Sequence, residues 1–139
     1  MLISEIEINV RFSETDAMGV VWHGNYLKFF EDGREAFGEE YGIPYLAVYD
    51  NGFFIPIVKT EIDYKSSVKF GQRIKIITRF IPSRAAKIVF EYEVVNMNTG
   101  ELAAKGKTIQ VFTSREDGIL QLLIPDFYAD WLKKYNLTE

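Results

Sequence analysis

The hydrophobic pattern of this chain takes a helical period in one long stretch, residues 26–41. Apolar side chains and Gly33 recur there at three- and four-residue steps, with charged residues between them. This spacing predicts an amphipathic helix with a wide aromatic face. Asn25 is expected to cap its N-terminus, and Gly42 to end it. Gly33 costs about 1 kcal/mol relative to alanine inside a helix, so we expect another backbone, such as that of a sheet, to approach closely there.

Most of the remaining chain carries strand patterns. Residues 5–13 alternate strictly between apolar and polar side chains, which is typical of a half-buried strand. Pro56 predicts an edge position or a bulge for the strand that contains it, and Gly100 fits the left-handed position of a three-residue hairpin loop. The segments expected after the long helix are strands at 53–64, 72–81, 86–96 and 102–113, and a short helix at 124–135.

This order of elements predicts the α+β class. Hairpin-linked strands after a single helix imply an antiparallel five-stranded sheet with the helix covering one face. The 139 residues show no linker, repeat or low-complexity segment, so we expect one domain over residues 1–139, ending in a short helix and a tail. One helix cannot cover all the aromatic side chains of such a sheet, which favours association with further subunits.

Composition argues against several classes of protein. The formal net charge is -4 and no basic run occurs, so a nucleic-acid partner is not expected. No apolar run reaches the roughly 18 residues that a membrane span needs, so no membrane insertion is expected. The chain has no cysteine, which excludes a thiolate nucleophile and every zinc site built with cysteine. An N-terminus that has early acidic residues and no basic segment does not resemble a signal peptide, and we expect a cytoplasmic protein.

The junction at residues 13–26 carries the residues best suited to chemistry. Asp16 and the turn residue Gly19 precede His23, which stands just before the predicted helix start. Backbone N–H groups at a helix start are unpaired and carry partial positive charge. A carboxylate facing them could attack a carbonyl, or activate water to do so, while the carbonyl oxygen is held. Alternatively, Asp16 only bonds its own turn.

The sequence is compatible with several roles for His23. Its side chain could polarise a carbonyl or orient water, its backbone N–H alone could act as a donor, or it could be an ordinary residue near a cap. As the only histidine of the chain, it cannot build a histidine-rich metal site, and no metal is expected. Serine triads are arithmetically possible, but neither the nucleophile elbow nor a glycine-rich nucleotide motif is present. Arg84 and Lys87 could hold phosphate groups, or be a solvated strand end.

Residues 16–26 follow the pattern Asp-x-x-Gly-Val-Val-x-His-x-Asn-Tyr. This pattern resembles the opening of the hot-dog-fold acyl-CoA thioesterases, most closely the 4-hydroxybenzoyl-CoA thioesterases and the YbgC-type enzymes. Weaker similarity continues through Tyr64 and Gly71 to the final strands. The resemblance implies a curved antiparallel sheet wrapped around one long helix. It also implies edge-to-edge pairing of subunits into a homodimer, often doubled into a homotetramer, with active sites between subunits.

The resemblance also implies roles for individual residues. The catalytic aspartate of the family falls on Asp16, and the histidine of the YbgC-type branch falls on His23. The backbone N–H at position 23 corresponds to the donor that polarises the thioester carbonyl. Basic residues near Arg84 and Lys87 would hold the phosphates of coenzyme A, which is part of the substrate, and no separate cofactor is implied. Phe12 stands where some members carry a tyrosine.

Three functions remain as hypotheses at this point. The first is an acyl-CoA hydrolase, a thioesterase in which Asp16 acts as nucleophile or general base and His23 marks the helix start that holds the carbonyl oxygen. The second is a hot-dog hydratase or dehydratase with a histidine–carboxylate acid–base pair. The third is a non-catalytic acyl-CoA binding protein, which the missing hydroxyl at Phe12 makes conceivable.

Overall fold

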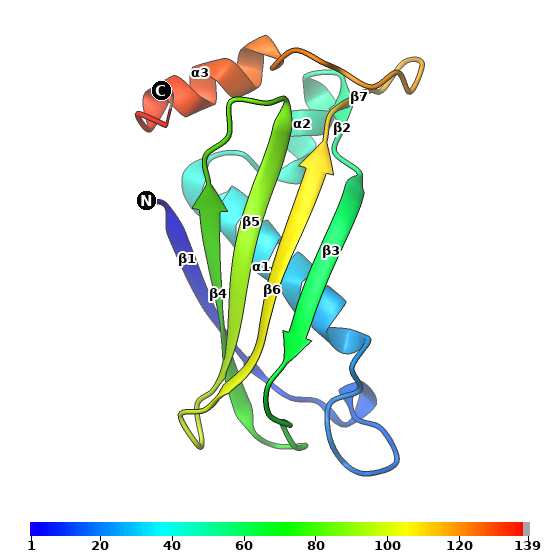
Figure 1. Ribbon diagram of the computed structural model, residues 1–139, viewed down its shortest axis with the longest axis vertical. Coiled ribbons are helices and arrows are strands. Elements are labelled where there is room, and N and C mark those ends of the chain that lie inside the picture. The colour runs from blue at the N-terminus through cyan, green and yellow to red at the C-terminus, as the bar shows by residue number, and fades with distance from the viewer. Residues whose placement is uncertain (138–139) are drawn as a thin grey trace.

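The computed structural model describes residues 1–137 and contains a five-stranded antiparallel sheet in the order β1-β4-β5-β6-β3 (Figure 1). Its strands are β1 (Ile3–Asn9), β3 (Ile57–Tyr64), β4 (Arg73–Ile81), β5 (Lys87–Asn96) and β6 (Leu102–Val111). The five-stranded antiparallel sheet is therefore confirmed. The N-terminal strand β1 pairs only with β4 and therefore forms one edge of the sheet. The other edge is β3, which pairs with β6.

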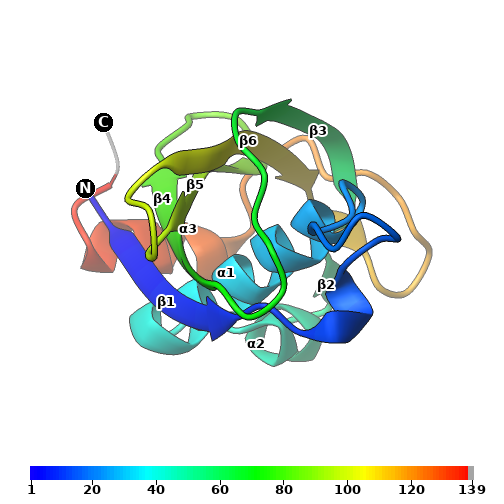
Figure 2. The same cartoon turned by 90° about the horizontal axis from the view of Figure 1, so that it is seen from below.

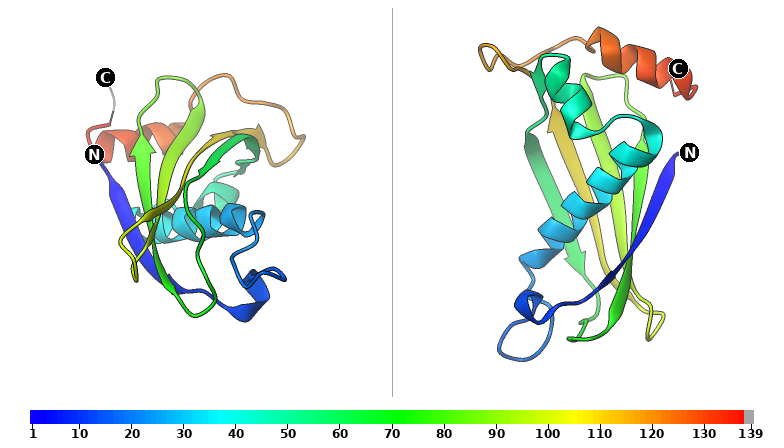
Figure 3. Two further views of the ribbon diagram at one scale, coloured as in Figure 1. Left: turned by 60° about the horizontal axis from the view of Figure 1, so that its bottom comes forward. Right: turned by 180° about the vertical axis from the view of Figure 1, so that it is seen from behind.

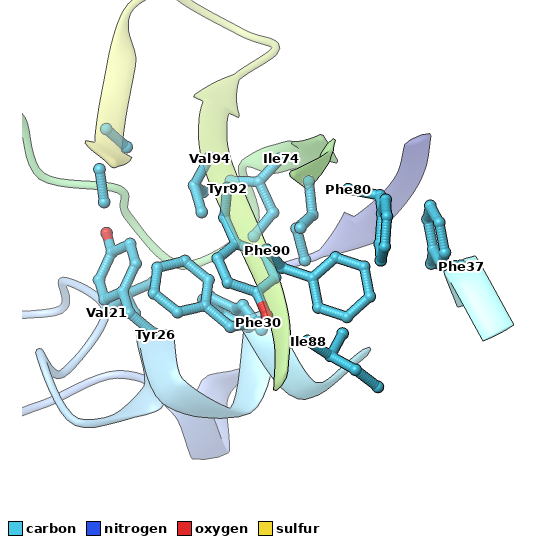
Figure 4. Close-up of a cluster of buried hydrophobic side chains, with 14 of the residues drawn as sticks. Val21, Tyr26, Phe30, Phe37, Ile74, Phe80, Ile88, Phe90, Tyr92 and Val94 are labelled. Atoms are coloured by element: carbon cyan, nitrogen blue, oxygen red, sulfur yellow. The ribbon is translucent and has the colours of Figure 1, made fainter. Parts of the chain in front are cut away.

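The long helix α1 (Asn25–Tyr41) lies against one face of the sheet, which curves around it (Figures 2 and 3). The side chains between helix and sheet are largely aromatic (Figure 4). Phe30 is fully buried and stacks on Tyr92 with ring centroids 4.3 Å apart. A Cβ atom added to Gly106 would come within 2.3 Å of the Phe30 ring, so the ring lies directly on the backbone of β6.

Smaller elements gather at one end of the sheet, at the top of Figure 1. They are α2 (Tyr45–Asp50), the two-stranded sheet of β2 (Phe53–Phe54) and β7 (Thr113–Ser114), and α3 (Asp126–Lys134). Trp131 fastens α3 to the end of α1, since its Nε1–H donates to the Tyr41 carbonyl at 2.8 Å. The predicted C-terminal helix is confirmed, whereas α2 and the separate pairing of β2 with β7 were not anticipated.

The N-terminal strand is shorter than its alternation predicts. It ends at Asn9, and residues Phe12–Glu14 form a 3-10 helix instead of continuing to residue 13. The cause is local, because the backbone N–H of Arg11 donates to the Glu14 carboxylate at 2.8 Å. The side-chain hydrogen bond competes with strand pairing, and alternation alone does not reveal it.

The start of α1 also differs from the prediction. Gly24, not Asn25, is the N-cap, and the amide of Asn25 donates to the carbonyl of Glu14 at 2.7 Å. The asparagine therefore ties the helix to the preceding loop. The predicted helix end is confirmed, since Gly42 adopts a left-handed conformation with φ +73°.

Pro56 divides the predicted strand 53–64 into β2 and β3, and a register shift follows between Ile57 and Lys59. The edge position and the irregularity expected from the proline are both confirmed. All residues of β3 except Ile62 are exposed, including Ile57 at 42% and Val58 at 59%. A long, exposed edge strand with apolar side chains is a template for pairing with another chain.

Gly33 meets the sheet as expected, because an added Cβ would lie 2.4 Å from Thr78 Oγ1 on β4. Thr78 is fully buried, and its hydroxyl has no hydrogen-bond partner among residues 1–137. We predict that Gly33→Ala lowers the free energy of unfolding by about 1–3 kcal/mol, since overpacking outweighs the gain in helix propensity. In a Thr78→Ala background the loss should be clearly smaller, because the closest clashing atom is gone. Equal losses in both backgrounds, measured by urea denaturation, would refute this packing account.

Candidate active site

The segment between β1 and α1, residues 10–24, forms a compact loop at the lower end of the molecule in Figure 1. Thr15 and Val21 pair as an antiparallel bridge. The N–H of Trp22 donates to the carbonyl of Glu14 at 3.0 Å. This hydrogen bond joins the residues next to the Thr15–Val21 bridge and closes the base of the loop. Both candidate catalytic residues are therefore carried by one hairpin-like loop that leads directly into the helix.

Asp16 is half-buried at the tip of this loop. Its Oδ1 accepts the N–H of Met18 at 2.8 Å, and the N–H of Gly19 donates to its carbonyl at 3.0 Å. The predicted turn role is thus confirmed, with Gly19 in a left-handed conformation at φ +78°. Among the hydrogen bonds of residues 1–137, none reaches the second carboxylate oxygen. The turn holds one oxygen of Asp16 and leaves the other available for a reaction.

The start of α1 offers backbone donors beside this loop. The N–H groups of Asn25 and Tyr26 point back to the carbonyls of Trp22 and His23, at 2.9 and 3.4 Å. Within residues 1–137, the N–H groups of His23 and Gly24 donate to no acceptor. Two adjacent N–H donors at the positive end of a helix can hold an anionic oxygen.

His23 is exposed, and its ring lies against Trp22 with centroids 4.9 Å apart. Its carbonyl accepts the hydroxyl of Tyr64, the last residue of β3, at 2.9 Å. The Tyr64 ring also packs edge-on against His23 and Tyr26, at 6.3 and 5.3 Å. Sequence reasoning did not assign Tyr64 to the site, because the contact spans 41 residues and no local pattern signals it.

Glu14 anchors the loop from inside. Its side chain is only 3% exposed and accepts the guanidinium of Arg11 at 3.2 Å and the ammonium of Lys28 at 3.1 Å. Burial raises the pKa of Glu14, but the hydrogen bonds from Arg11 and the charge of Lys28 outweigh it and hold the pKa below its ordinary value. Because Lys28 belongs to α1, this carboxylate fixes the loop to the helix. It is a second residue that the sequence patterns did not single out.

We predict that Glu14→Gln lowers the free energy of unfolding by about 2–3 kcal/mol at pH 7, the scale of hydrogen bonds to a charged group. The lowered pKa means that the carboxylate stabilises the fold above its ordinary value of 4.5, and that this contribution is lost as pH falls through the folded-state pKa. Urea denaturation at pH 7 and at a series of lower pH values should therefore show the two proteins converging as the Glu14 carboxylate is protonated in the folded state. Glu7→Gln, which removes a surface ion pair with Arg73, is the control with a small effect. A gap of equal size at every pH value would contradict the assignment.

Arg84 and Lys87 lie at the far end of the sheet from Asp16 within one protomer. They belong to the β4–β5 connection and the start of β5, whereas the Asp16 loop lies near the other end of these strands (Figure 1). The ten residues of β5 span about 30 Å at the usual rise per residue. A single protomer therefore does not bring the two predicted phosphate-binding residues to the carboxylate.

Over residues 1–137, no helix is long and apolar enough to cross a membrane, and no three or more aspartate, glutamate or histidine side chains are grouped as metal ligands would be.

The chain matches a known family. Residues 10–132 fit the Thioesterase-like superfamily, and the chain belongs to this superfamily. The expected hot-dog architecture, in which a curved sheet wraps one long helix, is thereby confirmed, as is the expectation that the chain belongs to a class of thioester hydrolases.

Individual relatives cover nearly the whole chain. "Putative acyl-CoA thioesterase YneP" of Bacillus subtilis (strain 168) is 31% identical over 136 residues, which span 98% of this chain and 97% of the relative. A 1,4-dihydroxy-2-naphthoyl-CoA hydrolase of Rippkaea orientalis is 33% identical over 132 residues, with 94% and 95% of the two chains covered. The crystal structure of a DHNA-CoA thioesterase from Staphylococcus aureus superposes with a TM-score of 0.86 at 31% identity, and covers 98% of this chain and 90% of its own.

Proposed function

We propose that this chain is an acyl-CoA thioester hydrolase, in which Asp16 supplies the nucleophile or general base and the start of α1 at His23 holds the carbonyl oxygen. One observation carries the proposal. One loop carries a half-buried carboxylate, of which one oxygen receives no hydrogen bond from residues 1–137. The same loop carries two backbone N–H groups that donate to no acceptor within those residues. Acyl transfer needs an attacking oxygen and a pair of donors for the developing oxyanion.

Two routes use these groups in nearly the same geometry. In the first, the free oxygen of Asp16 attacks the thioester carbon, the coenzyme A thiolate leaves, and water hydrolyses the resulting anhydride. In the second, Asp16 takes a proton from a water molecule, which attacks the same carbon directly. Both routes give a carboxylic acid and free coenzyme A. An oxyanion donor of this kind is typically worth about 10²–10³ in rate, and the exposed His23 side chain would serve to position the substrate.

The proposed working unit is a dimer formed along β3. The strand presents an unpaired edge over Ile57–Tyr64 with exposed Ile57, Val58 and Tyr64, and a second copy could continue the sheet there. Because a two-fold axis reverses the strand direction, the upper end of one copy comes beside the lower end of the other. A tetramer made from two such dimers and a cytoplasmic location stay predictions.

This pairing also gives Arg84 and Lys87 a place in the site. In the dimer, the start of β5 of one copy lies at the same end as Asp16 of the second copy. These two cations would then hold the phosphates of coenzyme A across the interface. Coenzyme A enters as part of the substrate, and no separate cofactor is proposed.

The identity of the acyl group is a separate question from the type of reaction. Relatives with more than 30% identity are named for acyl-CoA and for 1,4-dihydroxy-2-naphthoyl-CoA. These names support acyl-CoA as the substrate class, and assignment to the 4-hydroxybenzoyl-CoA or YbgC-type branch stays a prediction.

The test is release of free thiol from a panel of aliphatic and aromatic acyl-CoA thioesters. The proposal expects stoichiometric formation of coenzyme A and the free acid. A hot-dog hydratase would change the acyl group without releasing thiol. A non-catalytic binding protein would bind acyl-CoA and turn none over. Either of these two results would refute the hydrolase assignment.

A further inference from the structure

A cavity of about 680 Å³ lies between α1 and the upper half of the sheet. Its walls are mainly apolar, with the aromatic Phe37, Phe80, Phe90, Tyr128 and Trp131 among the lining residues, and residues of α2 line one side. The volume falls within the range of pockets that bind small organic molecules. Apolar walls of this kind suit a flat or bulky apolar group.

Two polar side chains of these walls are buried or half-buried. The first is Arg34 of α1, which is half-buried and donates from one NH group to the Tyr92 hydroxyl at 3.1 Å. Tyr92 in turn bonds Thr108 at 2.6 Å, and burial raises the pKa of Tyr92 although Arg34 opposes this. Within residues 1–137, no carboxylate lies within ion-pair distance of Arg34. A half-buried guanidinium with several N–H donors left over is costly unless something else accepts them.

The second polar group is Gln110 of β6, which is 6% exposed and also lines the cavity. Its Nε2 donates to the carbonyl of Ile55 at 2.9 Å, and this fixes the orientation of the amide because only its NH₂ group can donate. The amide oxygen receives no hydrogen bond within residues 1–137. Gln110 lies two residues from Thr108 on the same face of β6, a spacing of roughly 7 Å along a strand. The cavity thus offers a donor from α1 and an acceptor from β6.

The charges around the cavity limit what these two groups can bind. Glu31, Glu35 and Glu39 line it together with Arg34, and Arg34 is the one cation among the lining residues. Three carboxylates beside one guanidinium repel an anionic ligand. A neutral group with a hydroxyl or carbonyl oxygen can accept from Arg34 without meeting this repulsion.

We propose that Arg34 and Gln110 of one copy select the acyl group for Asp16 of the second copy, and that they favour an uncharged acyl group with a hydroxyl or carbonyl oxygen near its distal end. This inference rests on the proposed hydrolase function and dimer. Ile57, at the upper end of β3, lines the cavity, whereas Tyr64 at the lower end contacts His23. If two β3 strands pair in antiparallel orientation, the cavity of one copy therefore lies toward the loop 10–24 of the other copy, which carries Asp16.

The first experiment compares kcat/KM for hydroxynaphthoyl-CoA and naphthoyl-CoA, which differ by one hydroxyl. We expect the natural chain to prefer the hydroxylated substrate by about 10- to 100-fold, the scale of one hydrogen bond to a charged group. Arg34→Met should lower kcat/KM for hydroxynaphthoyl-CoA more than for naphthoyl-CoA, so that the preference is lost. Gln110→Leu provides a second test should the arginine variant fail to fold, and it should reduce the same preference. A carboxynaphthoyl-CoA should be the poorest of the three substrates.

Two controls separate selection from a structural role. Tyr92→Phe removes the hydrogen bond that ties Arg34 to the sheet but keeps the guanidinium, so it should lower the Tm and retain the preference. Arg79→Met removes a cation that pairs with Glu93 elsewhere, and should change neither substrate. If Arg34→Met slows both substrates equally, Arg34 is structural and the inference is wrong. If the natural chain hydrolyses both substrates equally, this inference alone fails, whereas no thiol release from any acyl-CoA would refute the hydrolase assignment itself.

A mixed dimer tests whether the cavity serves the second copy. One subunit carries Asp16→Asn and the other Arg34→Met, with two affinity tags for purification. If the two residues of a site come from different copies, one site of this dimer is fully natural, and the hydroxyl preference should return. If both come from the same copy, the active site retains the Arg34→Met defect and no preference returns, which would overturn the assignment across the interface.

Discussion

Asp16→Asn should lower kcat/KM for acyl-CoA hydrolysis by about 10²–10⁴-fold, the range attributed to a positioned acid–base group, while leaving the fold intact. Asparagine retains an oxygen that can accept the N–H of Met18, so the turn survives. What it loses is a second oxygen able to attack a carbon or take a proton. Steady-state thiol release and the Tm of both proteins are the measurements.

Asp117→Asn is the matched control for this experiment. Asp117 makes the same kind of turn, because its Oδ1 accepts the N–H of Ile119 at 3.0 Å, but it lies outside the proposed site. An equal loss of activity in both variants would trace the defect to turn chemistry. Unchanged kcat/KM in Asp16→Asn with every substrate that the natural chain hydrolyses would remove Asp16 from the mechanism.

Val58→Asp should convert the proposed dimer into monomers and remove most of the activity. Val58 is 59% exposed on the edge strand β3, and a two-fold axis would place both new charges in the same interface. Like-charge contacts of this kind cost several kcal/mol, which corresponds to a rise of at least about 10³-fold in the dimer Kd. Light scattering coupled to size-exclusion chromatography reports the association, and thiol release at the same protein concentration reports the activity.

Met97→Asp controls for the introduction of a charge at an exposed apolar position. Met97 is 41% exposed in the β5–β6 hairpin, away from β3, so this variant should remain dimeric and active. A Val58→Asp protein that is monomeric and fully active would show that one protomer suffices for hydrolysis. A Val58→Asp protein that remains dimeric would place the interface on another surface.

The sequence predicted the fold well because hydrophobic period is a direct consequence of burial. Apolar residues recur at three- and four-residue steps over 26–41 because one face of α1 packs on the sheet. Gly33 lies where Thr78 of β4 comes closest to the helix. Pro56 likewise marked an edge strand for a physical reason, the missing N–H donor. Signals of this kind are local, so they can be read without coordinates.

The candidate site could be predicted only in part for the same reason. Asp16 and His23 stand in one motif, and the structure places both on one loop. Glu14 and Tyr64 act through side-chain contacts to residues that are distant in the chain, and no periodicity encodes such contacts. The separation of Arg84 and Lys87 from Asp16 follows from strand direction, which a motif does not report.

The hydroxyl of Tyr64 joins the edge of the sheet to the carbonyl of His23. If copies associate through that edge, the orientation of the proposed oxyanion donors at His23 and Gly24 becomes thermodynamically linked to assembly. Linkage is reciprocal, so a bound thioester would tighten the contact between subunits as much as that contact tightens its binding, and dilution would weaken both together.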